Sequence, residues 1–214
     1  KEDLIAAIIA KGGRDVLESG AWVAIHNYTI NHPLDYPDDD VNQRGKALTV
    51  EAYRADGSWA WDNLPLETIN AWRWQDKNPG VTILEDAACF RSFELFNHYV
   101  VRALGRPLPM IATEGGVVVG WRDDRRYPRI TPAMHEQMSV AIFSYMQTDA
   151  PSYLFAICPW LLANYALGHF GPGWESQAWF TNWWDSQFGL SGRLPAVDAV
   201  AALLGREDQV ADFL

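Results

Sequence analysis

Three short apolar runs, separated by segments of helical periodicity, constrain the fold of this chain more than any other feature. The runs are AWVAIHNYT (21–29), MIATEGG (110–116) and YLFAICPWLLANY (153–165). Each run is apolar and is bounded by turn-forming residues, which is typical of a buried strand. Strands that alternate with helices pair in parallel, because a parallel pair needs a long crossover connection. The sequence therefore predicts an α/β fold with a parallel sheet.

Helical spacing of apolar residues marks the segments around these runs. Residues 2–18 are expected to be helical with a break at two glycines, and residues 88–104 place a large apolar residue every three or four positions. Thr131 followed by Pro132 is a typical helix start, and this helix is expected to end near Gln147. Residues 195–205 and 207–213 predict a closing amphipathic helix.

Two segments lack a clear period. Residues 31–67 carry three prolines and a run of aspartates, which predicts a long irregular loop with room for one short helix. Loops of this length inside a compact domain are usually functional. Residues 68–76 are expected to form one or two helical turns, and residues 81–86 a short strand or loop edge. The tryptophan-rich stretch 168–189 is expected to be a loop.

Composition bounds the class of protein. The 214 residues predict a single α/β domain spanning 1–214, and 49% hydrophobic residues suffice for a core. The formal net charge of −10 argues against nucleic acid as a partner, because affinity for a phosphate backbone comes from Lys and Arg. It also argues against an anionic membrane surface. No apolar run approaches the ~18 residues of a membrane span.

Polar and aromatic residues stand at the end of each predicted strand. The first ends with His26 and Tyr28, the second with Glu114, and the third with Trp160, while Trp121 follows shortly after Glu114. The carboxyl ends of parallel strands meet at one edge, where binding sites of α/β proteins lie. A carboxylate can attack or stabilise an oxocarbenium-like centre, and an indole offers an apolar platform to a sugar ring. The set therefore predicts a sugar-hydrolysing site.

The three runs also resemble strands of one enzyme family. PMIATEGG resembles the seventh strand of clan A glycoside hydrolases, which are (β/α)8 TIM-barrel retaining enzymes with a nucleophilic glutamate at that position. AWVAIHNYT is similar to their sixth strand, whose tyrosine contacts the nucleophile, and FAICPW to their eighth, whose tip carries a platform tryptophan. The resemblance covers strand tips within about 20–165. It implies Glu114 as nucleophile, Tyr28 and His26 as its holders, and Trp160 as a platform.

The sequence also departs from that family. Clan A enzymes carry their acid/base glutamate after an asparagine at the fourth strand tip, and no Asn-Glu pair occurs in this sequence. A full barrel needs eight strands and about 250 residues. We therefore expect the C-terminal portion of a barrel, with the acid/base outside this chain. The first residue, Lys1, is consistent with a piece of a longer polypeptide. Exposed strand edges invite pairing, so a missing N-terminal barrel half or a homo-oligomer is expected.

The expected function is retaining hydrolysis of a β-linked glycan, with an oligo- or polysaccharide as partner and no cofactor or metal. The alternative is a non-catalytic carbohydrate-binding or interaction module on a degenerate glycosidase barrel. A third interpretation is an unrelated α/β protein whose tryptophans serve packing alone. A glycan substrate favours an extracellular location, which the two cysteines do not determine.

Every candidate residue also has a structural interpretation that stays open. Glu114 can cap a strand end, His26 can be a satisfied core histidine, and Trp160 can belong to the core. Cys89 and Cys158 are expected to be buried thiols, with a disulfide as the alternative. The C-terminal tryptophans favour packing over extra sugar subsites: Trp174, Trp179, Trp183 and Trp184.

Charged residues outside the strand tips are assigned weaker roles. Glu175 and Asp185 are further carboxylates that could replace a missing acid. Residues 122–126 are expected to form surface ion pairs, with closure over a sugar as the alternative. Residues 38–42 alternate like a calcium loop but lack its glycine and final glutamate, which favours a solvated acidic loop.

Overall fold

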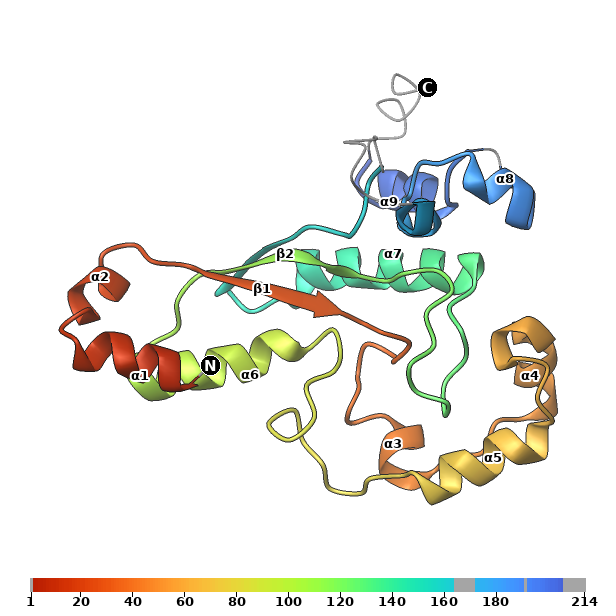
Figure 1. Ribbon diagram of the computed structural model, residues 1–214, viewed down its shortest axis with the longest axis horizontal. Helices are drawn as coiled ribbons and strands as arrows, with labels where there is room; N and C mark the ends of the chain where they lie inside the picture. The colour runs from red at the N-terminus through yellow and green to blue at the C-terminus, as the bar shows by residue number, and fades with distance from the viewer. Residues whose placement is uncertain (1, 164–171, 191, 206–214) are drawn as a thin grey trace.

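The computed structural model describes residues 2–163, 172–190 and 192–205, and its centre is a three-stranded parallel sheet (Figure 1). The strands β1 (Val23–Tyr28), β2 (Met110–Gly116) and β3 (Leu154–Ile157) lie side by side in that order. The predicted α/β fold with parallel pairing is confirmed.

The third strand is shorter than the sequence suggested. β3 ends at Ile157, and Pro159 has no N–H to continue the ladder. Two further hydrogen bonds still keep this segment beside β2, from the N–H of Cys158 to Ala112 and from the N–H of Trp160 to Gly115. The expected strand residues 164 and 165 lie outside the described part of the chain.

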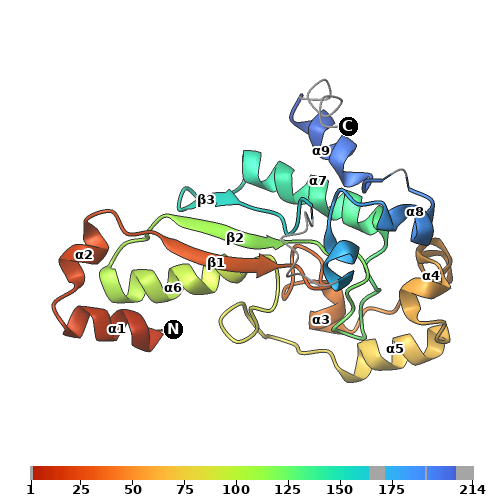
Figure 2. The ribbon, with the colours of Figure 1, turned by 45° about the horizontal axis from the view of Figure 1, so that its top comes forward.

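Helices cover one face of the sheet. α6 (Ser92–Leu104) and α7 (Pro132–Thr148) pack on the same side, as Figures 1 and 2 show, and both match the predicted helices. α1 (Glu2–Ala10) lies against α6 and is followed by α2 (Arg14–Glu18), so the expected break at the glycine pair is confirmed. The buried cluster between sheet and helices includes Ile25, Met110, Ala112, Leu154, Phe93, Val100 and Ile142.

The opposite face of the sheet is open in the described chain. We define this open face by four exposed residues, Ala24, His26, Thr113 and Phe155, of which Phe155 is 75% exposed. Within the described residues, β1 and β3 have no further strand on their outer edges. Parallel sheets are normally covered on both faces, so this surface is suited to contact with additional chain or a ligand.

The long segment after β1 is more helical than expected. It contains α3 (Asp40–Arg44), α4 (Val50–Asp56), the 3-10 helix η1 (Ser58–Trp61) and α5 (Leu66–Gln75). The prediction of a long irregular loop with room for one short helix over 31–67 was therefore wrong, whereas the helical turns expected at 68–76 are confirmed by α5. We call residues 40–75 the crossover insertion. Figures 1 and 2 show that it lies beyond the carboxyl ends of β1 and β2.

Local caps and a small core explain these short helices. The Asp39 carboxylate accepts hydrogen bonds from two N–H groups of α3, and the Thr49 hydroxyl caps α4 in the same way. Trp61 and Ile69 are fully buried in a cluster of their own. Helices of one or two turns show too few repeats for a periodic signal. Residues 81–86 form turns and not the suggested strand.

The stretch expected to be a loop, 168–189, contains helices among its described residues, namely η2 (Pro172–Gln177) and α8 (Trp183–Phe188). The helix expected at 195–205 is confirmed by α9 (Ala196–Leu203), which packs on α7. Trp179 and Trp184 are buried, so their packing role is confirmed. The side chain of Trp174 and the expected helix at 207–213 lie outside the described residues.

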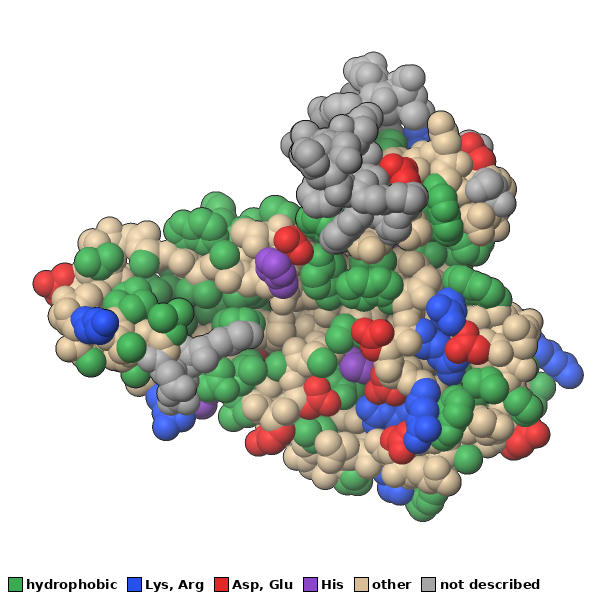
Figure 3. Space-filling view, in the orientation of Figure 1, with side chains coloured by type: hydrophobic (Ala, Val, Ile, Leu, Met, Phe, Trp, Pro, Cys, Tyr) green, Lys and Arg blue, Asp and Glu red, His purple; other side chains and the backbone are tan. Residues whose placement is uncertain are grey.

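Ion pairs tie the loop after β2 to the crossover insertion, where Figure 3 shows acidic and basic side chains interspersed. Arg122 and Arg129 both pair with Asp62 of the insertion, and Arg125 pairs with Asp76, the residue that directly follows the insertion. Arg126 is buried and bonds to Asp124. The expected ion pairs are confirmed, and they connect the loop after β2 to the segment after β1.

Three other expectations are settled by the fold. Asn42 is buried and accepts from Arg126, so this part of 38–42 is not a solvated loop. Cys89 and Cys158 are both free, but Cys158 is exposed and the expectation of two buried thiols was half wrong. No helix among the described residues combines the length and apolarity that crossing a membrane requires.

Candidate functional site

Glu114 lies at the carboxyl end of β2, where the pairing register with β1 shifts. Ile25 pairs with Ala112, and the next residue, His26, pairs with Glu114, which leaves Thr113 as an extra residue in β2. Strict alternation would place Glu114 on the buried face with Ala112. The bulge instead places Glu114 opposite His26, and directly opposed residues share a face. Glu114 therefore reaches the open face of the sheet.

Two side chains of β1 hold one oxygen of Glu114. The phenol of Tyr28 donates a 2.9 Å hydrogen bond to Oε2, and Nδ1 of His26 lies 3.4 Å from the same atom. The Glu114 side chain is 33% exposed. Within the described chain, no hydrogen bond or ion pair engages Oε1. Hydrogen bonding at Oε2 thus fixes the orientation of the carboxylate, and Oε1 is left available to a ligand.

Tyr28 is held in the protonated, donating form. Burial raises the pKa of Tyr28 well above its ordinary value, and the hydrogen bond and negative charge of Glu114 raise this pKa further. Its ring also lies 5.2 Å from the ring of Trp121 at a 42° tilt. The predicted residues Tyr28, Glu114, His26 and Trp121 therefore form one contiguous group.

The two glycines after Glu114 each have a structural cause. A Cβ on Gly115 would collide with Oδ1 of the fully buried Asn27. Gly116 has a φ of 84°, a left-handed conformation that favours glycine. Gly115 lets the end of β2 approach β1 closely, and Gly116 lets the chain turn away from β1 directly afterwards. Glu114 is positioned by this geometry.

A cavity of about 250 Å³ adjoins the site, and we call it the Tyr28 cavity. Its lining residues include both partners of Glu114, together with Trp121, Ser92 and Asp123. Asp123 is exposed and is the only carboxylate among the described residues that line this cavity. Sequence reasoning did not select Asp123 individually, because it stands inside a run of charged residues.

Trp160 is connected to the site mainly through its backbone. Its N–H donates to the carbonyl of Gly115 at 2.9 Å, which places it beside the tip of β2. Its indole Nε1 donates a 3.1 Å hydrogen bond to Oε1 of Gln177 in η2. The structure brings Trp160 to the predicted edge, with its ring bonded toward the C-terminal segment.

A second cavity, of about 280 Å³, also has Trp121 among its lining residues, and we call it the aromatic cavity. Rings from distant parts of the chain line it, among them Trp59 of η1 and Phe188 of α8. Sequence analysis did not identify these two residues as site residues. The sequence feature that could have indicated Trp59 is its position in the long segment 31–67, for which a functional role was expected.

The other acidic candidates serve the C-terminal segment. Oε2 of Glu175 accepts a 2.5 Å hydrogen bond from the Thr181 hydroxyl, and Oδ1 of Asp185 accepts from the N–H of Gly192. Neither is bonded to Glu114, whose partners in the described chain are His26 and Tyr28.

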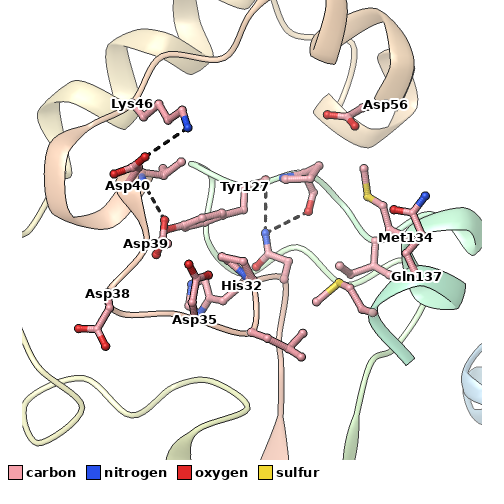
Figure 4. Close-up of a pocket in the computed structure, with 17 residues that line it drawn as sticks. His32, Asp35, Asp38, Asp39, Asp40, Lys46, Asp56, Tyr127, Met134 and Gln137 are labelled. Atoms are coloured by element: carbon pink, nitrogen blue, oxygen red, sulfur yellow. Dashed lines mark hydrogen bonds and ion pairs between the residues drawn. The ribbon is translucent and has the colours of Figure 1, made fainter. Parts of the chain in front are cut away.

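A larger cavity, about 710 Å³, lies beside the crossover insertion and shares no lining residue with the Tyr28 cavity (Figure 4). Its carboxylates are largely engaged: Asp40 pairs with Lys46, and Asp39 accepts from Tyr127. Within the described part of the chain, no group of three His, Cys, Asp or Glu residues could hold a metal ion. We assign this cavity no catalytic role.

Comparison of the chain with protein-family models, with curated proteins and with solved structures finds no match.

Proposed function

We propose that this chain belongs to a retaining glycoside hydrolase that acts on a β-linked glycan, with Glu114 as the nucleophile. One observation carries the proposal: Tyr28 and His26 hold Oε2 of Glu114, while no described residue engages Oε1. A nucleophilic carboxylate needs one fixed orientation and one available oxygen. The position at the carboxyl end of a parallel strand is also where such sites lie.

The proposed reaction uses each oxygen differently. Oε1 attacks the anomeric carbon, the bond from that carbon to the leaving oxygen breaks, and a glycosyl ester of Glu114 forms. Oε2 becomes the ester carbonyl and still accepts the Tyr28 hydrogen bond. Water then attacks the anomeric carbon and releases the Glu114 carboxylate; one proton of this water stays on the new sugar hydroxyl and the other balances the proton that the leaving oxygen took up in the first step. His26, 55% exposed, lies at the open side of this group.

The sheet is proposed to be the C-terminal portion of a (β/α)8 barrel. The order β1-β2-β3 matches the order expected for strands that resemble the sixth, seventh and eighth. The open face would then be the barrel interior, and the outer edges of β1 and β3 would pair with the remaining strands. Those strands would come from an N-terminal barrel half or from a second copy of the chain.

Retaining hydrolysis needs a second carboxyl group about 5–5.5 Å from the first. We assign no acid/base residue here. Among the described residues Asp123 is the carboxylate that lines the Tyr28 cavity, and a glutamate of the remaining barrel strands is the other candidate. The absence of an assigned acid/base is the observation that favours the second candidate, a non-catalytic carbohydrate-binding module.

Covalent trapping separates the two candidates. The chain would be incubated with 2-fluoro glycosides of glucose, xylose, mannose and galactose that carry an activated leaving group, and then mapped by peptide mass spectrometry. An activated leaving group needs no general acid, so the reaction requires only the nucleophile. We expect a label on Glu114 in the native chain and none in Glu114→Gln. Folded protein that takes no label from any glycoside would support the binding module.

A further inference from the structure

Trp121 lines two cavities at once. The Tyr28 cavity contains the partners of Glu114, and the aromatic cavity adjoins it through the same indole. A ligand seated at Glu114 would therefore have a second compartment next to it. The shared Trp121 places the aromatic cavity next to the proposed reaction site.

The aromatic cavity is assembled from two distant segments. Trp59 comes from η1 in the crossover insertion, and Phe188 from α8 near the C-terminus, yet their ring centroids are 5.6 Å apart. Figure 2 shows α8 close to α4, which is a helix of the insertion. Trp59 remains 44% exposed, so its ring is accessible in spite of this contact.

The residues that line the aromatic cavity indicate which class of ligand it can bind. None of the described residues that line the aromatic cavity carries a charge, and its polar side chains outside the indoles belong to Ser176 and Gln177. Arg122 and Arg129 lie nearby and share the single carboxylate of Asp62. Arg129 lies over the ring of Trp59, but neither arginine lines the cavity. Flat apolar rings beside uncharged hydrogen-bonding groups suit the C–H face and hydroxyls of a neutral sugar.

We propose that the aromatic cavity is a subsite for a second, uncharged sugar unit of the glycan whose reacting sugar lies at Glu114. This inference rests on the proposed function for the identity of the first unit. At about 280 Å³ the cavity is below the roughly 300–1,000 Å³ of drug-sized ligand sites and suits a single ring. The substrate is accordingly a neutral oligo- or polysaccharide, not a uronic acid polymer or a sulfated glycan.

The dependence of affinity on oligosaccharide length tests the proposed subsite. The affinity of Glu114→Gln would be measured by titration calorimetry with β-1,4-linked glucose, xylose and mannose oligosaccharides of increasing length. Oligogalacturonate serves as the charged comparison. We expect affinity for one neutral series to rise from one unit to longer chains. Adding Trp59→Ala should lower the affinity for the longer chains about tenfold and leave the single unit unaffected.

Trp74→Ala is the matched control. Trp74 is also an exposed tryptophan of the insertion, with Lys77 over its ring, but it does not line the cavity. Its removal should leave every affinity unchanged, and Trp59→Phe should restore part of the loss. Equal affinity for all lengths, or an equal effect of both alanine variants, would overturn the subsite, as would tighter binding of oligogalacturonate.

The two proposals fail in different experiments. Trp59-dependent binding of longer neutral chains without a trapped Glu114 would leave the subsite standing and remove the hydrolysis. A covalent label on Glu114, together with binding that does not depend on chain length, would support the hydrolysis and overturn the subsite.

Discussion

The phenol of Tyr28 donates a 2.9 Å hydrogen bond to Oε2 of Glu114, although 86 positions of chain separate the two residues. Parallel pairing of β1 with β2 brings them together, and the bulge at Thr113 turns the carboxylate toward the phenol. The contact therefore depends on both the strand order and a one-residue irregularity.

Tyr28→Phe should slow formation of the glycosyl ester with an activated aryl glycoside by roughly 10- to 100-fold, because a hydrogen bond to a charged group contributes about 1.5–3 kcal/mol. The measurement is the pre-steady-state release of the aryl group, with KM and kcat separated. Tyr99→Phe on α6 is the control. An unchanged rate in Tyr28→Phe would remove Tyr28 as a positioning residue, provided that the urea midpoint is also unchanged.

Gly115→Ala should destabilise the fold by about 1–3 kcal/mol, because its Cβ collides with Oδ1 of the buried Asn27. Urea unfolding measures this loss. The same substitution in an Asn27→Ala background should cost less, because the colliding atom is gone. Equal losses in the two backgrounds would mean that the collision does not determine the requirement for glycine.

His135 should make stability dependent on pH between about 6.5 and 4. Burial lowers the pKa of His135 to about 4, against an ordinary value of 6.5. The unfolded chain binds the proton in this window and the folded chain does not, so stability is complete above pH 6.5 and falls as pH drops. A difference of 6.5 − 4 corresponds to roughly 3 kcal/mol.

The check on His135 is urea unfolding of the native chain and of His135→Phe across this window. The variant should lose the corresponding slope. His98→Phe, at an exposed position of α6, should keep it. A slope of the same size in His135→Phe would assign the pH dependence to other groups.

Asp124→Asn should destabilise the protein by about 3 kcal/mol at pH 7, since it leaves Arg126 and His32 without their carboxylate. Burial opposes ionisation, but hydrogen bonds from His32 and Arg126 outweigh it and lower the pKa of Asp124. This stabilisation is present above the unfolded pKa of about 3.9 and is lost as pH falls through the lower folded value.

Thermal unfolding at pH 7 and below pH 4 measures the effect of Asp124→Asn, with Asp123→Asn as the exposed neighbour control. The loss in Asp124→Asn should shrink at the lower pH. If both variants lose the same stability at pH 7, the buried ion pair does not stabilise the loop.

The parallel α/β fold could be predicted because periodicity is a local property. The strand 110–116 and the helix that begins after Thr131 are visible in the sequence, since apolar spacing and a cap residue suffice to indicate them. The same reasoning selected Glu114, Tyr28, His26 and Trp121, because strand ends of a parallel sheet converge.

Local patterns in the chain indicated the three strands, the long helices, the parallel pairing and the residues at the strand tips. Packing places Glu114 on the same face as His26, because alternation from Ala112 would have buried it and the bulge reverses this. Packing also brings Trp59 to Phe188, 129 positions away, and stabilises the short helices of the insertion. Register shifts, long-range ring contacts and ion pairs depend on packing between distant segments, which no local pattern encodes.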